Sequence, residues 1–178
     1  MKISELLEQK GKAGTYAGVR FSPSTNKLLH KFINTYSIPN AVKPNKFHTT
    51  VLYSRKPCPN YKPQGKLLPP MYGEAEEFVM WPTRGENGPP SKCLVLKYKC
   101  PELCDRHTSL MKQHQATYDY DEYVPHVTLS YDVGDDFDVA ALNKANILQS
   151  LGKLEIAEEY YEPLDEGGWA GNATKWSS

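Results

Sequence analysis

Apolar and polar residues alternate along several short stretches of this 178-residue chain, a pattern typical of β-strands with one buried face. In residues 15–21, Ala17 and Val19 fall on one face while Tyr16 and Arg20 fall on the other. We expect the first face to point into the core. The same reasoning predicts further strands at residues 46–54, 74–82, 92–99, 124–131 and 153–164.

Helical spacing of apolar residues predicts helices between these strands. A helix-start signal at Ser22-Pro23-Ser24 introduces the first of them, which we expect to run to about Tyr36. Others are predicted at residues 3–10, 101–117 and 138–151. Residues 58–72 are rich in proline and are predicted to form a long irregular loop.

The resulting order is β-α-β, a hairpin and then α-β-α-β, which predicts an α+β fold. We expect one domain over residues 1–178, with residues 1–12 and 170–178 peripheral.

Two of the predicted strands carry the same His-x-Thr triplet, at His48–Thr50 and at His126–Thr128. Because side chains alternate along a strand, the histidine and threonine of each triplet point to the same face. If the two strands lie side by side, one groove receives two imidazoles and two hydroxyls.

Such a groove is suited to acid–base chemistry on a phosphodiester without a metal. Displacement at phosphorus needs a base that removes one proton and an acid that delivers another. Histidine serves both roles because its ordinary pKa is about 6.5. Threonine hydroxyls can donate to the non-bridging oxygens as charge develops. The pattern does not tell which histidine is the acid, and it predicts a bell-shaped dependence of rate on pH.

The composition limits the classes of ligand that the chain is expected to bind. The 21 basic and 21 acidic residues balance, whereas proteins that grip a long phosphate backbone carry a basic excess. Twelve tyrosines and three tryptophans can stack on bases, although most of them are expected in the core. The four cysteines lack the spacing of a zinc site, and we interpret them as reduced thiols. The first 15 residues lack the apolar core of a signal peptide, and no stretch is long enough to span a membrane, so we expect a cytoplasmic protein.

Twin His-x-Thr strands between α-β portions resemble the two-histidine (2H) phosphoesterase superfamily. Within it, the chain looks similar to the phage anti-CBASS protein 1 family across roughly residues 13–170. The likeness is carried by residues 14–21, 38–40, 48–56, 125–130 and 162–165, and by the downstream Trp169.

This resemblance implies two pseudo-symmetric α-β lobes with mainly antiparallel sheets that flank a central active-site groove. It implies a metal-independent enzyme without cofactors that hydrolyses 3′–5′ bonds of cyclic di- and trinucleotides such as 3′,3′-cGAMP. A 2′-hydroxyl would attack and form a 2′,3′-cyclic phosphate, later hydrolysed. The enzyme would silence CBASS immunity in the cytoplasm of an infected bacterium, with no long nucleic acid and no membrane as partner.

Carried over by position, the implied catalytic residues are His48, Thr50, His126 and Thr128. The implied substrate-binding residues are Tyr16, Trp81, Glu162 and Trp169.

Two alternatives stay open. A related 2H enzyme would act on RNA 2′,3′-cyclic ends or on a cyclic phosphate of ADP-ribose, and the balanced charge argues mildly against long RNA. A non-catalytic sponge would sequester a cyclic nucleotide, although binding alone does not require two titratable groups.

Overall fold

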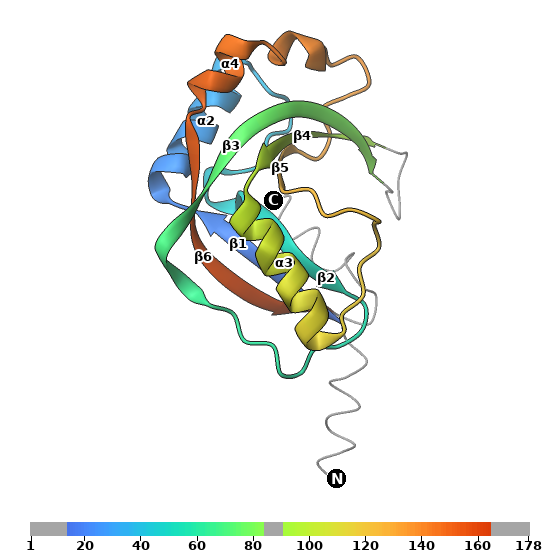
Figure 1. The fold of residues 1–178 in the computed structure, drawn as a ribbon. Helices are drawn as coiled ribbons and strands as arrows, with labels where there is room; N and C mark the ends of the chain where they lie inside the picture. Colours follow the sequence, from blue (N-terminus) through green and yellow to red (C-terminus); the bar gives the residue numbers. More distant parts are fainter. Residues whose placement is uncertain (1–13, 84–90, 165–178) are drawn as a thin grey trace.

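The computed structural model describes residues 14–83 and 91–164. The predicted helix at 3–10 and the region around Trp169 lie outside the described residues. The elements, shown in Figure 1, are β1 (Thr15–Phe21), α2 (Pro23–Thr35), η1 (Pro44–Lys46), β2 (His48–Ser54), β3 (Gly65–Thr83), β4 (Ser91–Lys99), α3 (Pro101–His114), β5 (His126–Ser130), η2 (Val139–Leu142), α4 (Ala145–Ser150) and β6 (Lys153–Pro163). The predicted α+β class and the predicted order of strands and helices are therefore confirmed.

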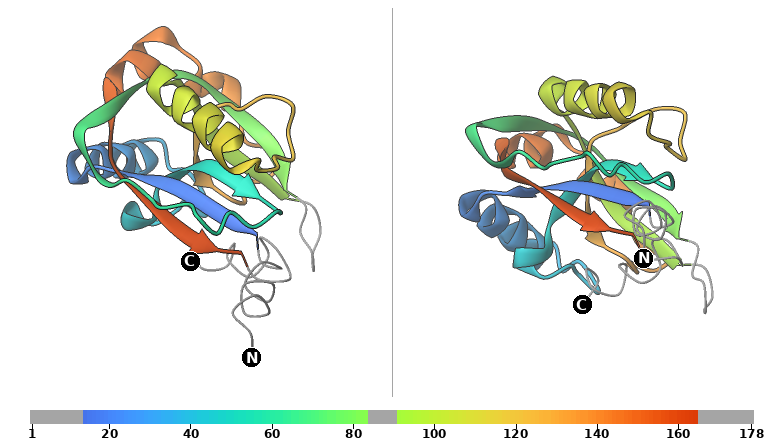
Figure 2. Two further views of the ribbon diagram at one scale, coloured as in Figure 1. Left: turned by 60° about the horizontal axis from the view of Figure 1, so that its bottom comes forward. Right: turned by 90° about the horizontal axis from the view of Figure 1, so that it is seen from below.

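All six described strands belong to one antiparallel sheet, in the order β2-β1-β6-β3-β4-β5. The pairing of β6 with β3 makes this sheet continuous, and the expected division into two pseudo-symmetric lobes stays a prediction. β3 bends strongly along its length (Figure 1). The two views of Figure 2 show that the direction of the strands changes from β1 to β4, so the sheet is twisted.

The two edge strands of this sheet, β2 and β5, come together, and we call the line where they meet the seam. The threonine Oγ1 of Thr49 on β2 donates to the carbonyl of His126 on β5, at 2.8 Å. Beside it, the segment before β2 forms an isolated bridge between Ala41 and Ser130, and the Val42 N–H donates to the Leu129 carbonyl at 2.8 Å. The seam is what brings two strands distant in sequence to one place.

Local sequence explains where the helices begin and end. The Ser22 hydroxyl caps α2 by accepting from the Thr25 N–H, and Pro23 occupies the first turn, as predicted. α3 ends earlier than expected, at His114, because Gln115 adopts a left-handed conformation with φ of 48°. None of the helices among the described residues is long and apolar enough to span a bilayer.

The helices and one face of the sheet share a single hydrophobic core. Leu29 and Phe32 of α2 and Leu103 and Leu110 of α3 are buried with the core-facing strand residues. On the other face, Tyr16 belongs to a separate small cluster with Leu164, Tyr53 and Tyr160. This second face carries the histidine triplets.

The predicted loop over 58–72 is only partly correct, because β3 already begins at Gly65. Gly65 and Lys66 pair with β6, and the ladder resumes at Met71 after a register shift. The two prolines, Pro69 and Pro70, lie inside that interruption, where no ladder N–H is required of them. The proline content therefore led to the prediction of a loop where a strand pairs with β6 on both sides of the interruption.

The predicted helix over 138–151 is wrong as a single element, since it is divided into η2 and α4. Between them, the Asn143 side chain pairs with the backbone of Phe78 on β3. Its Oδ1 accepts from the Phe78 N–H at 2.7 Å, and its Nδ2 donates to the Phe78 carbonyl at 2.8 Å. A side chain that satisfies strand backbone in this way competes with helix continuation.

Candidate active site

The two triplets occupy the facing edge strands, each with its histidine and threonine on the partly exposed side. On β2, His48 and Thr50 are partly exposed while Thr49 between them is buried. On β5, His126 and Thr128 show the same alternation. The seam therefore brings the four residues together from both ends of the sheet.

Both imidazoles are oriented by the same local hydrogen bond. Nδ1 of His48 lies 2.9 Å from the Lys46 carbonyl, and Nδ1 of His126 lies 2.8 Å from the Val124 carbonyl. A carbonyl only accepts, so each Nδ1 carries a hydrogen and donates it. Proton exchange during chemistry then takes place at Nε2 of each ring.

The electrostatic surroundings favour the neutral form of both rings. Burial lowers the pKa of His48 to about 4, and the charges of His126 and Arg20 add to this effect, while the Lys46 carbonyl opposes it. Burial also lowers the pKa of His126, with the Val124 carbonyl opposing the shift. The charge of His126 is one of the causes that lower the pKa of His48, so protonation of His126 disfavours protonation of His48.

Each threonine is hydrogen-bonded to a tyrosine. The hydroxyls of Tyr16 and Thr50 are 3.2 Å apart, and those of Tyr131 and Thr128 are also hydrogen-bonded. The site is therefore built twice. We call His48, Thr50 and Tyr16 the first half-site, and His126, Thr128 and Tyr131 the second half-site.

Gly18 makes room for the tyrosine of the first half-site. It pairs with Thr50 across the β1–β2 ladder. A Cβ added at Gly18 would lie 2.8 Å from the hydroxyl oxygens of both Tyr16 and Tyr160. The absence of a side chain at this position lets the Tyr16 hydroxyl reach Thr50.

A bulge follows the first triplet. The β1–β2 register shifts between Ala17 and Gly18, which leaves Val51 as an extra residue on β2. The Val51 carbonyl lies 2.6 Å from Nδ1 of His107, and the Thr50 carbonyl accepts from the Tyr123 hydroxyl at 2.7 Å. The His107 and Tyr123 rings stack with centroids 4.2 Å apart. Bulges beside functional sites re-aim side chains, and here buried aromatic groups fix the bulge.

A cation stands directly across the ladder from each histidine. Arg20 pairs with His48 on the β1–β2 ladder, and Lys97 pairs with His126 on the β4–β5 ladder. Residues directly opposite on antiparallel strands share a face, so each cation lies on the same face of the sheet as the histidine across from it. Each is held by a carboxylate, at 3.2 Å for Arg20–Glu158 and at 3.4 Å for Lys97–Glu77.

The remaining predicted residues are placed differently. The Trp81 ring lies edge-on to His126, with centroids 4.7 Å apart. Tyr16 is fully buried and borders the site through its hydroxyl. Glu162 is half-buried and pairs with Tyr16 across the β1–β6 ladder. Trp169 lies outside the described residues.

Sequence reasoning did not single out Tyr131 or Tyr160. Strict alternation would place Tyr131, which follows the last residue of β5, on the face opposite Thr128. The register shift between Leu94 and Val95 leaves Leu129 as an extra residue, and Tyr131 bonds to Thr128. Tyr160 lies under the Arg20 guanidinium, whose Cζ is 3.9 Å from its ring centroid. The alternation of apolar and polar residues does not predict a role for Tyr131 in the site. The same alternation correctly predicted that Arg20 lies on the face of Tyr16.

No cluster of three or more metal-ligating side chains occurs in the ranges 14–83 and 91–164. The fold and site thus define an α+β protein with two His-x-Thr strands joined at the edges of one antiparallel sheet.

Comparison with known proteins gives the family. Residues 13–171 match the family described as anti-CBASS protein Acb1. An anti-CBASS protein Acb1 of Vibrio phage KVP40 is 33% identical over 165 residues, covering 93% of this chain and 95% of the relative. The Enterobacteria phage T4 protein of the same name is 33% identical over 155 residues, covering 85% and 88%. The chain belongs to the anti-CBASS Acb1 family.

Proposed function

We propose that this chain hydrolyses 3′–5′ phosphodiester bonds of cyclic di- or trinucleotides, such as 3′,3′-cGAMP, during phage evasion of CBASS immunity. The observation that carries the proposal is the pair of imidazoles from β2 and β5, each oriented by its Nδ1 and flanked by a threonine hydroxyl. The names of the curated relatives support the biological direction, since each is an anti-CBASS protein.

In the proposed reaction His48 is the base and His126 the acid. Burial and, to a smaller extent, the charges of His126 and Arg20 oppose protonation of His48, so in the proposed scheme a proton taken up by the pair goes to His126. Nε2 of His48 removes the proton of the 2′-hydroxyl, and the 2′-oxygen forms a bond to phosphorus. The P–O5′ bond breaks, and Nε2 of His126 gives its proton to the leaving 5′-oxygen.

The product of this step is a 2′,3′-cyclic phosphate. Its hydrolysis reverses the roles, because His126 is then neutral and His48 protonated. Water loses a proton to His126 as it attacks phosphorus, and His48 protonates the departing 2′-oxygen. The phosphate anion between the rings favours one charged imidazole and so offsets the lowered pKa values.

The neighbouring groups fit an anionic substrate with bases. The hydroxyls of Thr50 and Thr128 would donate to the non-bridging oxygens as charge develops. Arg20 and Lys97 are cations across from the two histidines, and Trp81 offers an aromatic ring beside His126. The balanced charge of the whole chain favours a small ligand with few phosphates.

The direct test is incubation of the purified chain with 3′,3′-cGAMP in EDTA, followed by chromatography. We expect a linear product, and its loss in His48→Gln and His126→Gln. A His30→Gln variant serves as the matched control, because His30 is exposed on α2. A substrate peak that stays unchanged over a long incubation with the wild type would refute the proposal.

Two other results would redirect it. Faster processing of a linear oligonucleotide with a 2′,3′-cyclic end would favour the RNA-end activity. Stoichiometric ligand recovered unchanged after prolonged incubation would favour the sponge.

A further inference from the structure

Thr49 carries a hydroxyl at a position that the second triplet fills with an apolar residue. It lies between His48 and Thr50, points to the core side and is only 1% exposed. The corresponding residue of the second triplet is Val127, which is fully buried. A buried hydroxyl needs hydrogen-bond partners, and those of Thr49 lie on two other strands.

Thr49 is the central member of a buried hydrogen-bonded chain that crosses the seam. The Tyr98 hydroxyl on β4 donates to Thr49 Oγ1 at 2.7 Å, and Thr49 Oγ1 donates to the His126 carbonyl at 2.8 Å. Tyr98 itself is 1% exposed, and its ring packs under Gly73, where an added Cβ would approach it to 2.4 Å. The donor at the start of the chain is therefore held rigidly.

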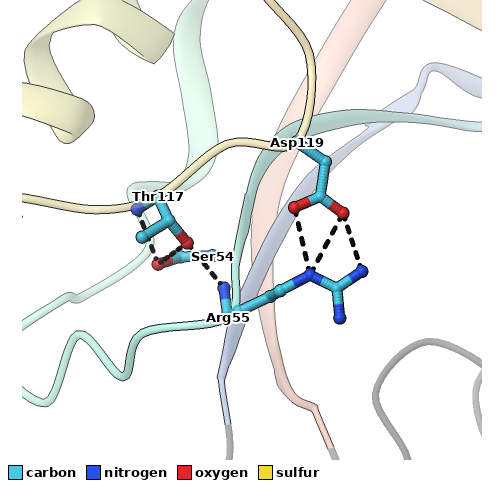
Figure 3. Close-up of polar contacts among 4 residues, drawn as sticks. All are labelled: Ser54, Arg55, Thr117 and Asp119. Carbon is cyan, nitrogen blue, oxygen red and sulfur yellow. Dashed lines mark hydrogen bonds and ion pairs between the residues drawn. The ribbon is translucent and has the colours of Figure 1, made fainter.

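Other contacts join the regions around β2 and β5 at positions other than the level of the two imidazoles. Beyond the C-terminal end of β2, Arg55 forms a forked ion pair with Asp119, and the Ser54 hydroxyl and Arg55 N–H both bond to Thr117 (Figure 3). At the end of β5, the isolated bridge between Ala41 and Ser130 joins the segment before β2 to β5. The bond from Thr49 acts at the level of the histidines, on the backbone of His126 itself.

We propose that Thr49 is a positioning residue that, with Tyr98, fixes the separation of the two imidazoles. This inference rests on the proposed function. Thr49 touches no substrate in this scheme, since its side chain lies on the core side of β2. It acts by holding the His126 backbone against β2, so that both Nε2 atoms reach one phosphorus.

The test compares Thr49→Val with Thr49→Ser. Valine keeps the shape and loses the hydroxyl, so we expect kcat to fall about 10- to 100-fold with KM within about twofold, as small misplacements of catalytic groups do. Serine keeps the hydroxyl and is expected to restore most of kcat. The matched control is Thr25→Val, because Thr25 is also buried and its hydroxyl accepts from the Glu155 N–H, a contact between α2 and β6 that involves neither histidine strand. A Thr49→Val variant with wild-type kcat overturns the proposal.

Tyr98→Phe provides a second variant if Thr49→Val does not fold. It keeps the ring under Gly73 and removes the donor to Thr49. We expect a smaller loss of kcat than in Thr49→Val, because the bond to the His126 carbonyl remains. An unchanged kcat in Tyr98→Phe together with full activity of a folded Thr49→Ala variant also overturns the proposal.

A measurement that needs no turnover separates this inference from the proposed function. The charge of His126 lowers the pKa of His48, so His126→Gln is expected to raise that pKa when followed by NMR titration. In a Thr49→Val background the same replacement should raise it by less, because the rings are no longer held together. An equal rise in both backgrounds contradicts a positioning role, whereas absent turnover in the wild type contradicts only the proposed function.

Discussion

The two half-sites share one backbone design and differ in what surrounds it. In both, a strand histidine donates Nδ1–H to the carbonyl two residues earlier, and a threonine two residues later bonds to a tyrosine. A cation stands across from each histidine and a bulge follows each triplet, at Val51 and at Leu129. Arg20 is among the causes that lower the pKa of His48, after burial, whereas the Trp81 ring lies edge-on to His126. The repeated part orients the rings, and in the proposed mechanism the different parts set which ring holds the proton.

The strongest way to break the comparison is to remove either imidazole. We expect His48→Gln and His126→Gln each to lower kcat about 10³-fold, since positioned acid–base groups contribute about 10²–10⁴-fold. Each variant should also lose a different limb of the pH–rate profile of cyclic dinucleotide cleavage. Loss of the same limb in both variants would contradict distinct roles for the two half-sites.

The second prediction concerns stability. The pKa of His48 is about 4 in the folded chain and 6.5 in the unfolded chain. The unfolded state therefore binds more protons than the folded state between these two pH values. Stability therefore rises with pH across this window and is lost as pH falls toward 4. We expect His48→Gln to shrink the difference in unfolding free energy between pH 7 and pH 5 by about 2 kcal/mol.

This difference is measured by urea unfolding at the two pH values. His30→Gln is again the matched control, since His30 is exposed in α2. An identical pH dependence in wild type and His48→Gln would show that His48 is not held neutral by burial.

The third prediction tests the feature particular to the second half-site. Trp81→Ala should raise KM for a cyclic dinucleotide about tenfold, because stacking on an aromatic ring contributes about 1–3 kcal/mol per base. Steady-state kinetics measures the change. Tyr120→Ala is the control, since Tyr120 is 74% exposed and lies in the loop before β5. Equal effects of the two replacements would leave Trp81 without a role in binding.

The smallest expected effect concerns the charge of Arg20 near His48. Arg20→Gln removes a positive charge that disfavours protonation of His48, so the pKa of His48 should rise. NMR titration of the imidazole follows it. Arg55→Gln is the control, because the Arg55 side chain is engaged with Asp119 at the end of β2. A fall in the pKa of His48 in Arg20→Gln would reverse the proposed assignment of base and acid.

Much of the fold was predictable because local chemistry determines it. The Ser22 cap and Pro23 begin α2, and alternation defines both histidine strands. The same alternation correctly grouped each histidine with its threonine, because no bulge lies inside either triplet.

What could not be predicted depends on bulges and on long-range contacts. Leu154 and Ile156 are buried in the core, and parity along β6 would place Tyr160 with them. The register shift beside Phe21 leaves Ala157 as an extra residue, so Tyr160 lies opposite Gly18 and packs with Tyr16 on the face of the two histidines. The contact of β2 with β5 likewise includes a hydrogen bond from Thr49, whose partners are far away in sequence.

The meeting of β2 and β5 has a consequence for the behaviour of the chain in a crowded cell. An edge strand normally presents a row of backbone donors and acceptors that another molecule can extend, and this is a common start of aggregation. Here both edges of the described sheet turn toward each other, and side chains such as Thr49 and Tyr123 occupy their carbonyls. The arrangement that assembles the two histidines thus also shields the sheet from adding foreign strands.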